Sequence, residues 1–361
     1  MYIVIFTSLV CLFLTYLDSI GLYRRGLSVS FFLLTIIAAI HYDYGNDYMV
    51  YYDLYKTSTY YPFDYKAIID GDYKDYGWVF LCYFFKPFGG FFTMVAVLSI
   101  IQNYLVYRFI KMHVCKSWWP MSIFVYLFLT NYYLLNLSML RQGFIICVFL
   151  GLWTYIRDKK WWIPLIVLLL CSTIHTSSKI LIPFSFWGFV PTRNNKIIAL
   201  IYGLLLLLLL LSGSFINSLL DSVLQVEEFY DYAMIYDDDQ YSVTFGLGYI
   251  LGLIPFIVAV YYLLSTRDNN ANIQIVMIAM LSSIITPFTS VIPLLGRVGL
   301  YFGVFQMCTI PLTFNSIKKR EIRASLLLLW MSIHLFSYWM FFNNSIYMKS
   351  YRDFHTIFDV L

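Results

Sequence analysis

Four polar side chains in apolar surroundings are the residues of this sequence best suited to chemistry. Arg141 lies in NLSMLRQGFIICVFL and His175 lies in LLLCSTIHTSSKILIPF. Arg297 lies in SVIPLLGRVGLYFGVF, and Asp47 directly follows another apolar run. Two guanidinium groups at one cavity would clamp a diphosphate, because each offers a planar fork to phosphate oxygens. A nearby histidine or carboxylate would then serve as acid or base.

Each of these residues also has a plainer interpretation. An arginine near the end of an apolar helix can extend its charged group to the membrane surface, which applies to Arg141 and Arg297. His175 can be a hydrogen-bonded polar group between helices, and Lys179 an anchor at the interface. The residues alone leave these alternatives open, although ionisable groups in apolar spans usually have a function.

The composition indicates the class of protein to which these residues belong. The chain has 361 residues, of which 61% are hydrophobic and only 12% are charged. Soluble domains average about 25% charged residues. A soluble enzyme, a nucleic-acid-binding protein and a disordered chain are therefore excluded. The six cysteines lie mostly in apolar runs without the spacing of metal ligands, so no metal site is expected.

The apolar runs predict an all-α polytopic membrane protein, a single integral membrane domain over 1–361 with about twelve transmembrane helices. The predicted spans are 1–17, 28–41, 88–107, 118–135, 137–156, 161–175, 177–190, 197–213, 244–264, 272–287, 294–314 and 324–342. Two consecutive spans, 161–175 and 177–190, are short. The turn between them, around His175, is predicted to dip below the membrane surface and line a cavity, where irregular backbone is tolerated.

Charge predicts the orientation of these spans. Most of the 24 Lys and Arg residues fall in alternate loops, which the positive-inside rule places in the cytoplasm. Both termini and all four polar residues are then expected at the external face.

Two long segments, 42–77 and 214–243, are predicted to be extracytoplasmic loops over the site. Both are rich in Tyr and Asp. Carboxylates accept hydrogen bonds from hydroxyl groups and aromatic rings stack on sugars, so this composition suits a glycan. The alternative is that tyrosines simply favour membrane interfaces.

Five short patterns follow one another over about 41–301: His41-Tyr42-Asp43-Tyr44-Gly45-Asn46-Asp47-Tyr48, Asp75-Tyr76-Gly77-Trp78, Arg141-Gln142, His175-Thr176-Ser177, and Gly296-Arg297 with Tyr301. In this order they resemble the EpsG-like branch of the Wzy-type polysaccharide polymerases, bacterial proteins of exopolysaccharide, capsule and O-antigen synthesis. The chain departs from the family pattern at His41, where the family has Arg, and at Asp75, where it has Glu.

The resemblance implies a glycosyltransferase C-like fold and an inverting glycosyltransferase. Such an enzyme moves a glycan from undecaprenyl diphosphate to the non-reducing end of another lipid-linked repeat unit, on the outer face of the bacterial inner membrane. It implies no metal or cofactor. The expected partners are the lipid-linked donor and acceptor, membrane lipids and a chain-length regulator.

The roles of individual residues follow from this reaction. Arg141 and Arg297 are expected to stabilise the leaving diphosphate. Asp47 or His175 is expected to accept the proton, and the sequence does not decide between them. The predicted substrate-binding residues are His41, Tyr48, Asp75, Gln142, Lys179, Tyr301 and Arg352.

Three other functions remain open from the sequence. An O-antigen ligase would use lipid A or protein as its acceptor. A transporter of lipid-linked sugar would need a polar pathway through its centre, whereas the charges here gather outside. A membrane acyltransferase would keep catalytic residues near a cytoplasmic acyl donor, and the cytoplasmic loops are merely short and basic.

Overall fold

The structure is a computed structural model that describes residues 1–60, 62, 64–66, 75–130, 132–211, 252–266, 270–285 and 293–360. The predicted loop 214–243 lies outside these residues. The chain forms two compact units. The first unit comprises Met1–Val190 with Gln306–Leu361, and the second comprises Pro191–Phe305.

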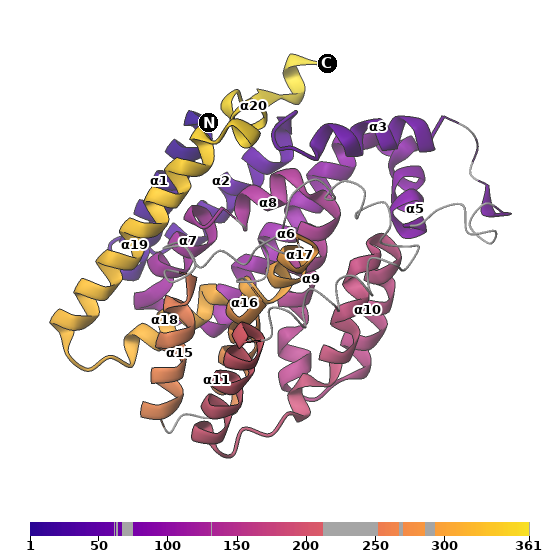
Figure 1. Ribbon diagram of the computed structural model, residues 1–361. Coiled ribbons are helices and arrows are strands. Elements are labelled where there is room, and N and C mark those ends of the chain that lie inside the picture. Colours follow the sequence, from indigo (N-terminus) through magenta and orange to yellow (C-terminus); the bar gives the residue numbers. More distant parts are fainter. Residues whose placement is uncertain are drawn as a thin grey trace. The chain divides into compact units, whose positions relative to one another are not determined.

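The first unit is built from helices, with one very short strand pair (Figure 1). Its α-helices are α1 (Tyr2–Ser19), α2 (Gly26–Ile40), α3 (Tyr48–Ser58), α5 (Tyr76–Phe85), α6 (Gly90–His113), α7 (Trp119–Phe128), α8 (Tyr133–Ser138), α9 (Leu140–Arg157), α10 (Trp162–Ile174), α18 (Gln306–Asn315), α19 (Arg320–Asn343) and α20 (Ser345–Arg352). Its 3-10 helices are η1 (Lys86–Phe88), η2 (Lys116–Trp118), η3 (Thr176–Phe189) and η5 (Ile357–Asp359).

The described part of the second unit is also helical. Its helices are α11 (Asn195–Leu211), α15 (Ile254–Ser265), α16 (Asn270–Ile285) and α17 (Pro293–Gly303). Helix α16 packs against α15, α11 and α17.

Three of the described helices are long and apolar enough to cross a membrane: α1, α6 and α19. Several shorter helices are also apolar, among them α2, α10, α11, α15 and α16. These helices confirm the predicted all-α membrane protein. The number of spans and the glycosyltransferase C-like fold stay predictions.

Two predicted spans are each interrupted. The span predicted at 118–135 is divided into α7 and α8, and the span predicted at 294–314 is divided into α17 and α18. These interruptions were not predicted, because the hydropathy of a segment shows that it is apolar but does not show at which residue a helix within it ends.

The predicted loop 42–77 contains α3 and the start of α5. In α3, Tyr48 and Tyr51 are buried one turn apart, so one face of this polar helix joins the core. Both belong to a buried aromatic cluster that includes Trp78 of α5, Phe91 of α6 and Leu140 of α9. This cluster fixes the loop segment on the helices that follow it.

The predicted span at 177–190 is wound as the 3-10 helix η3, which has 14 residues and contains Pro183. A 3-10 helix rises about 2.0 Å per residue, so η3 is about 28 Å long. An α-helix of the same residues would reach only about 21 Å. The tighter winding brings a short apolar segment close to the thickness of a bilayer core, about 30 Å.

Both chain termini lie beside the segment that follows α2. The strands β1 (His41–Tyr42) and β2 (His355–Thr356) pair antiparallel, with His41 opposite Thr356. The N-terminal amino group donates a hydrogen bond to the Arg352 carbonyl oxygen. Figure 1 shows the two termini close to each other at the same end of α1 and α19.

Candidate functional site

The carboxylate of Asp75 joins residues that are far apart in the sequence. Arg141 Nη1 donates a hydrogen bond to Oδ2 of Asp75 over 2.5 Å. The backbone N–H and the hydroxyl of Thr176 both donate to Oδ1, at 2.9 and 2.7 Å. Nδ1 of His175 lies 3.8 Å from Oδ2. We call Asp75, Arg141, His175 and Thr176 the Asp75 cluster.

Helix packing brings the members of the Asp75 cluster together. Asp75 immediately precedes α5, and α5 packs against α10, which ends just before His175. The two helices meet at Gly77, where an added Cβ would lie 2.1 Å from Oγ1 of Thr173 and 2.8 Å from its carbonyl carbon. Only glycine permits this approach, so the Gly77 of the sequence pattern allows Asp75 to reach the turn after α10.

Arg141 is the second residue of α9 and is enclosed by aromatic rings. Its guanidinium carbon lies 5.0 Å from the ring centre of Tyr51 and 5.9 Å from that of Trp78. The two rings are themselves 5.5 Å apart. Cation–π contacts and the carboxylate of Asp75 together hold the guanidinium in one position.

The electrostatics of Asp75 follow from these contacts. Burial opposes its ionisation, but His175, the hydrogen bonds from Thr176 and the charge of Arg141 outweigh burial and lower the pKa of Asp75 to about 2. Asp75 is therefore a carboxylate at neutral pH. Its charge compensates that of Arg141 and orients the groups around it.

Several polar atoms at this place are buried without a hydrogen-bond partner among the described residues. They are Nε of Arg141, Nε1 of Trp78 and both ring nitrogens of His175. The side chains of Arg141, His175 and Asp75 are 20%, 16% and 15% exposed, so water reaches the cluster only in part. Buried polar atoms without partners are costly, which points to a ligand that forms hydrogen bonds here.

His41 and Tyr48, two predicted substrate-binding residues, lie inside the first unit. Both side chains are 0% exposed. The ring nitrogens of His41 contact the carbonyl oxygens of Ala38, at 2.6 Å, and of Leu137, at 2.9 Å. The hydroxyl of Tyr48 donates to the carbonyl oxygen of His41. These contacts connect the end of α2 to α8 and α3.

Asp47, a candidate proton acceptor, makes its described contact elsewhere. Its backbone N–H donates to Oγ of Ser138, at 3.2 Å. Its neighbour Gly45 has φ of +117°, and a Cβ there would lie 2.5 Å from the Cβ of Ser138. The half-buried Asp47 therefore lies beside α8, immediately before α3 and one turn away from Tyr51 of the cluster's aromatic wall.

The other predicted site residues of the first unit lie as follows. Gln142 follows Arg141 and is buried. Lys179 is exposed, one turn beyond Thr176 in η3, and the exposed Arg352 ends α20. Arg297 and the buried Tyr301 belong to α17 in the second unit. The proposed meeting of Arg297 with Arg141 at one cavity stays a prediction.

Three residues of the cluster and its wall were not among the predicted site residues: Thr176, Tyr51 and Trp78. Each nevertheless lies within or next to one of the short patterns that identified its neighbours. Aromatic and hydroxyl side chains are too common in this sequence to be singled out by type. No group of three or more His, Cys, Asp or Glu side chains suited to a metal occurs in the described parts of the chain.

The fold and the cluster define an all-α membrane protein with a partly buried, charge-compensated polar site at the ends of its helices. The chain belongs to the EpsG family, whose model matches residues 24–352. The match covers all the patterns quoted above and confirms the resemblance. Family membership indicates a protein of polysaccharide synthesis. No curated protein and no solved structure matches the chain.

Proposed function

We propose that the chain is a Wzy-type polysaccharide polymerase, an inverting glycosyltransferase of the bacterial inner membrane. It transfers a glycan from undecaprenyl diphosphate to the non-reducing end of another lipid-linked repeat unit, with its site facing the exterior. One observation supports this proposal above the others. Asp75 fixes the guanidinium of Arg141 through Nη1, and Nε of Arg141, a buried donor, has no partner among the described residues.

Arg141 would stabilise the leaving group. In the transfer, the bond between the anomeric carbon and the diphosphate oxygen breaks, and that oxygen keeps the electron pair. Negative charge develops on the diphosphate as it leaves. A guanidinium already held in place by Asp75, Tyr51 and Trp78 needs little reorganisation to receive this charge. Arg297 would add a second positive charge.

His175 would accept the proton of the attacking hydroxyl. Its Nδ1 lies 3.8 Å from Oδ2 of Asp75, and its Nε2 is buried without a hydrogen-bond partner among the described residues. A carboxylate on one ring nitrogen orients the imidazole and stabilises its protonated form, as in catalytic triads. Asp47 lies beside Ser138, so His175 is the better candidate for the base.

The proposed reaction can be tested in cells that lack the chain. We expect them to accumulate undecaprenyl diphosphate carrying a single repeat unit in the outer leaflet, accessible to an impermeant glycan-modifying reagent. Re-expression should restore a ladder of longer glycans. The lipid-linked glycans would be extracted and separated by mass.

The same extraction distinguishes a polymerase from a ligase and from a transporter. A ligase would leave long glycans on the lipid carrier when the chain is missing. A transporter would leave single units in the inner leaflet, protected from the reagent. Either pattern would contradict a polymerase.

A further inference from the structure

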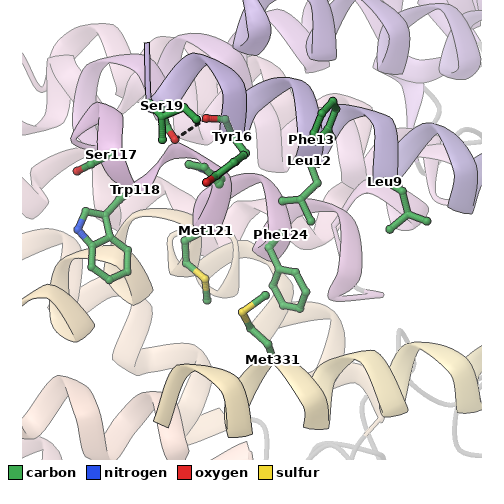
Figure 2. A pocket seen from close by; sticks show the side chains of 12 residues that line it. Leu9, Leu12, Phe13, Tyr16, Ser19, Ser117, Trp118, Met121, Phe124 and Met331 are labelled. Atoms are coloured by element: carbon green, nitrogen blue, oxygen red, sulfur yellow. Dashed lines mark hydrogen bonds between the residues drawn. The ribbon is translucent and has the colours of Figure 1, made fainter. Parts of the chain in front are cut away.

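An apolar groove in the first unit lies outside the proposed reaction site. It has a volume of 610 Å³, within the range of about 300–1,000 Å³ that is typical of ligand sites. Its walls come from α1, from η2 and the start of α7, and from Met331 of α19 (Figure 2). Helices α1 and α19, which contribute to these walls, are two of the candidate membrane spans.

The groove has a polar end and an apolar end. Figure 2 shows Ser19, Ser117 and Trp118 at one end and Leu9 at the other. Leu9 and Phe13 are 52% and 59% exposed, which leaves the hydrocarbon end open to a neighbouring chain. A ligand with a polar head and a long apolar tail fits this order of residues.

Positive charge surrounds the polar end. The guanidinium carbon of Arg323, in the first turn of α19, lies 6.0 Å from the ring centre of Trp118. Nζ of Lys116 lies 2.9 Å from Oδ1 of Asp18, and its side chain is 47% exposed. Arg24 and Arg25 follow α1 and are exposed.

The acidic groups at this end do not cancel that charge. The side chain of Asp18 is 4% exposed and also accepts a hydrogen bond from the backbone N–H of Leu27. Glu321 is the one acidic residue in the first turn of α19, next to Arg320 and Arg323. The rim therefore attracts an anionic headgroup, and the loops that carry it are the ones that the positive-inside rule assigns to the cytoplasm.

We propose that this groove binds one anionic phospholipid of the cytoplasmic leaflet, with its phosphate beside Arg323 and Lys116 and an acyl chain along Leu9, Phe13 and Met331. An apolar hollow open to the bilayer is filled by hydrocarbon, and juxtamembrane Lys and Arg residues select anionic headgroups.

The 24-residue helix α6 runs from Phe91 in the aromatic cluster to the turn before η2, about 36 Å away. The proposed lipid site therefore lies far from the Asp75 cluster.

Native mass spectrometry of the purified full-length chain tests this site. Phosphatidylglycerol and phosphatidylethanolamine with the same acyl chains would be added in equal amounts. We expect one phosphatidylglycerol to be retained in preference to phosphatidylethanolamine. Arg323→Gln should lower this preference about fivefold, which corresponds to the loss of one cation near an anionic headgroup. Lys160→Ala, which removes an exposed cation between α9 and α10, should leave it unchanged.

Substitutions that fill the groove test the position of the acyl chain. Met331→Trp and Leu9→Trp should each lower lipid retention about tenfold or more, since either indole occupies the volume of the tail. Leu9 is half exposed, so its substitution does not disturb the core. Leu328→Trp, at a position of α19 that is 66% exposed, is the matched control.

Three results would overturn the proposal. The first is equal retention of both lipids by the unsubstituted chain. The second is unchanged retention in both groove-filling variants. The third is displacement of phosphatidylglycerol by an equal amount of undecaprenyl phosphate, which would assign the groove to a polyprenyl chain.

Discussion

Helix α9 carries an arginine at each end, and the two arginines are held very differently. Arg141 lies in the first turn and pairs with Asp75, which is distant in sequence, whereas Arg157 ends the helix and pairs with its neighbour Asp158 at 2.9 Å. The side chains of the first pair are 20% and 15% exposed, and those of the second are 33% and 40% exposed.

The helix dipole also acts oppositely on the two arginines. A cation at the C-terminus of a helix is stabilised by the dipole, so Arg157 suits its position without any function. A cation in the first turn is destabilised, and Arg141 must be compensated by Asp75 and by two aromatic rings. An arginine that needs so much support is better explained by a ligand than by the stability of the fold.

The largest effect on polymer formation is expected from substitution of Asp75, the acidic residue of the first pair, in contrast to Asp158 of the second. Asp75→Ala should lower polymer formation about 100-fold or more, because Arg141 and His175 both lose the group that positions them. Asp158→Ala should leave polymer formation unchanged, since a surface ion pair contributes about 0–1 kcal/mol. Gel separation of the polymer at matched protein level measures both. Equal polymer from the two variants would remove the distinction between the pairs.

The next largest effect is expected from substitution of Gly77, where α5 closely approaches α10. Gly77→Ala places a methyl group against Thr173 and should lower the free energy of unfolding by about 1–3 kcal/mol while moving Asp75 away from Thr176. Gly203→Ala in α11 is the matched control, because nothing lies within 4 Å of an added Cβ there. Thermal unfolding in detergent would compare the two, and an equal change in both would show that the contact at Gly77 is unimportant.

Acid should weaken the Asp75 cluster. The pKa of Asp75 is about 2 in the folded chain, below its ordinary value of 3.8, so its ionised form stabilises the fold above pH 3.8. This stabilisation, on the order of 2 kcal/mol, is lost as the pH falls from about 4 toward 2. Asp75→Asn removes the titrating group, so the stability of that variant should depend less on pH over this interval. Parallel acid unfolding curves for both proteins would refute the assignment.

The smallest expected effect concerns Thr176. Thr176→Val removes the hydroxyl that donates to Asp75 but keeps the backbone N–H that also donates. One hydrogen bond to a charged group contributes about 1.5–3 kcal/mol at most, and the remaining donor should reduce the loss to about 1 kcal/mol. Polymer formation should fall about fivefold, and Thr176→Ser should restore it. No recovery with serine would show that the methyl group, and not the hydroxyl, is required.

The sequence predicted the general fold and the family, because apolar runs and charged loops are local properties of a chain. It also singled out Arg141, His175 and Asp75, which the structure brings together. It missed α3, since a Tyr- and Asp-rich segment has the composition of a surface loop and its buried tyrosines depend on distant partners. It also missed α5, an apolar helix of ten residues that is too short for a predicted span. The two-residue strands β1 and β2 have no pattern that a sequence could show.

The sequence could not distinguish exposed site residues from buried supporting ones. His41 and Tyr48 belong to the same pattern as Asp47, yet both are fully buried against backbone carbonyl groups. Which side of a segment faces the core depends on partners far along the chain, such as Leu137 and the strand β2. Thr176 was missed for the same reason, because its partner Asp75 is 101 positions away.

The most direct test of the proposed site compares Arg141→Ala with Arg157→Ala in cells that otherwise lack the chain. Both variants remove one arginine from α9, and membrane extracts would be matched for protein level before the lipid-linked glycans are separated by mass. We predict single repeat units on undecaprenyl diphosphate with Arg141→Ala and a normal ladder with Arg157→Ala. A normal ladder from both variants would contradict the role of Arg141 at the leaving diphosphate.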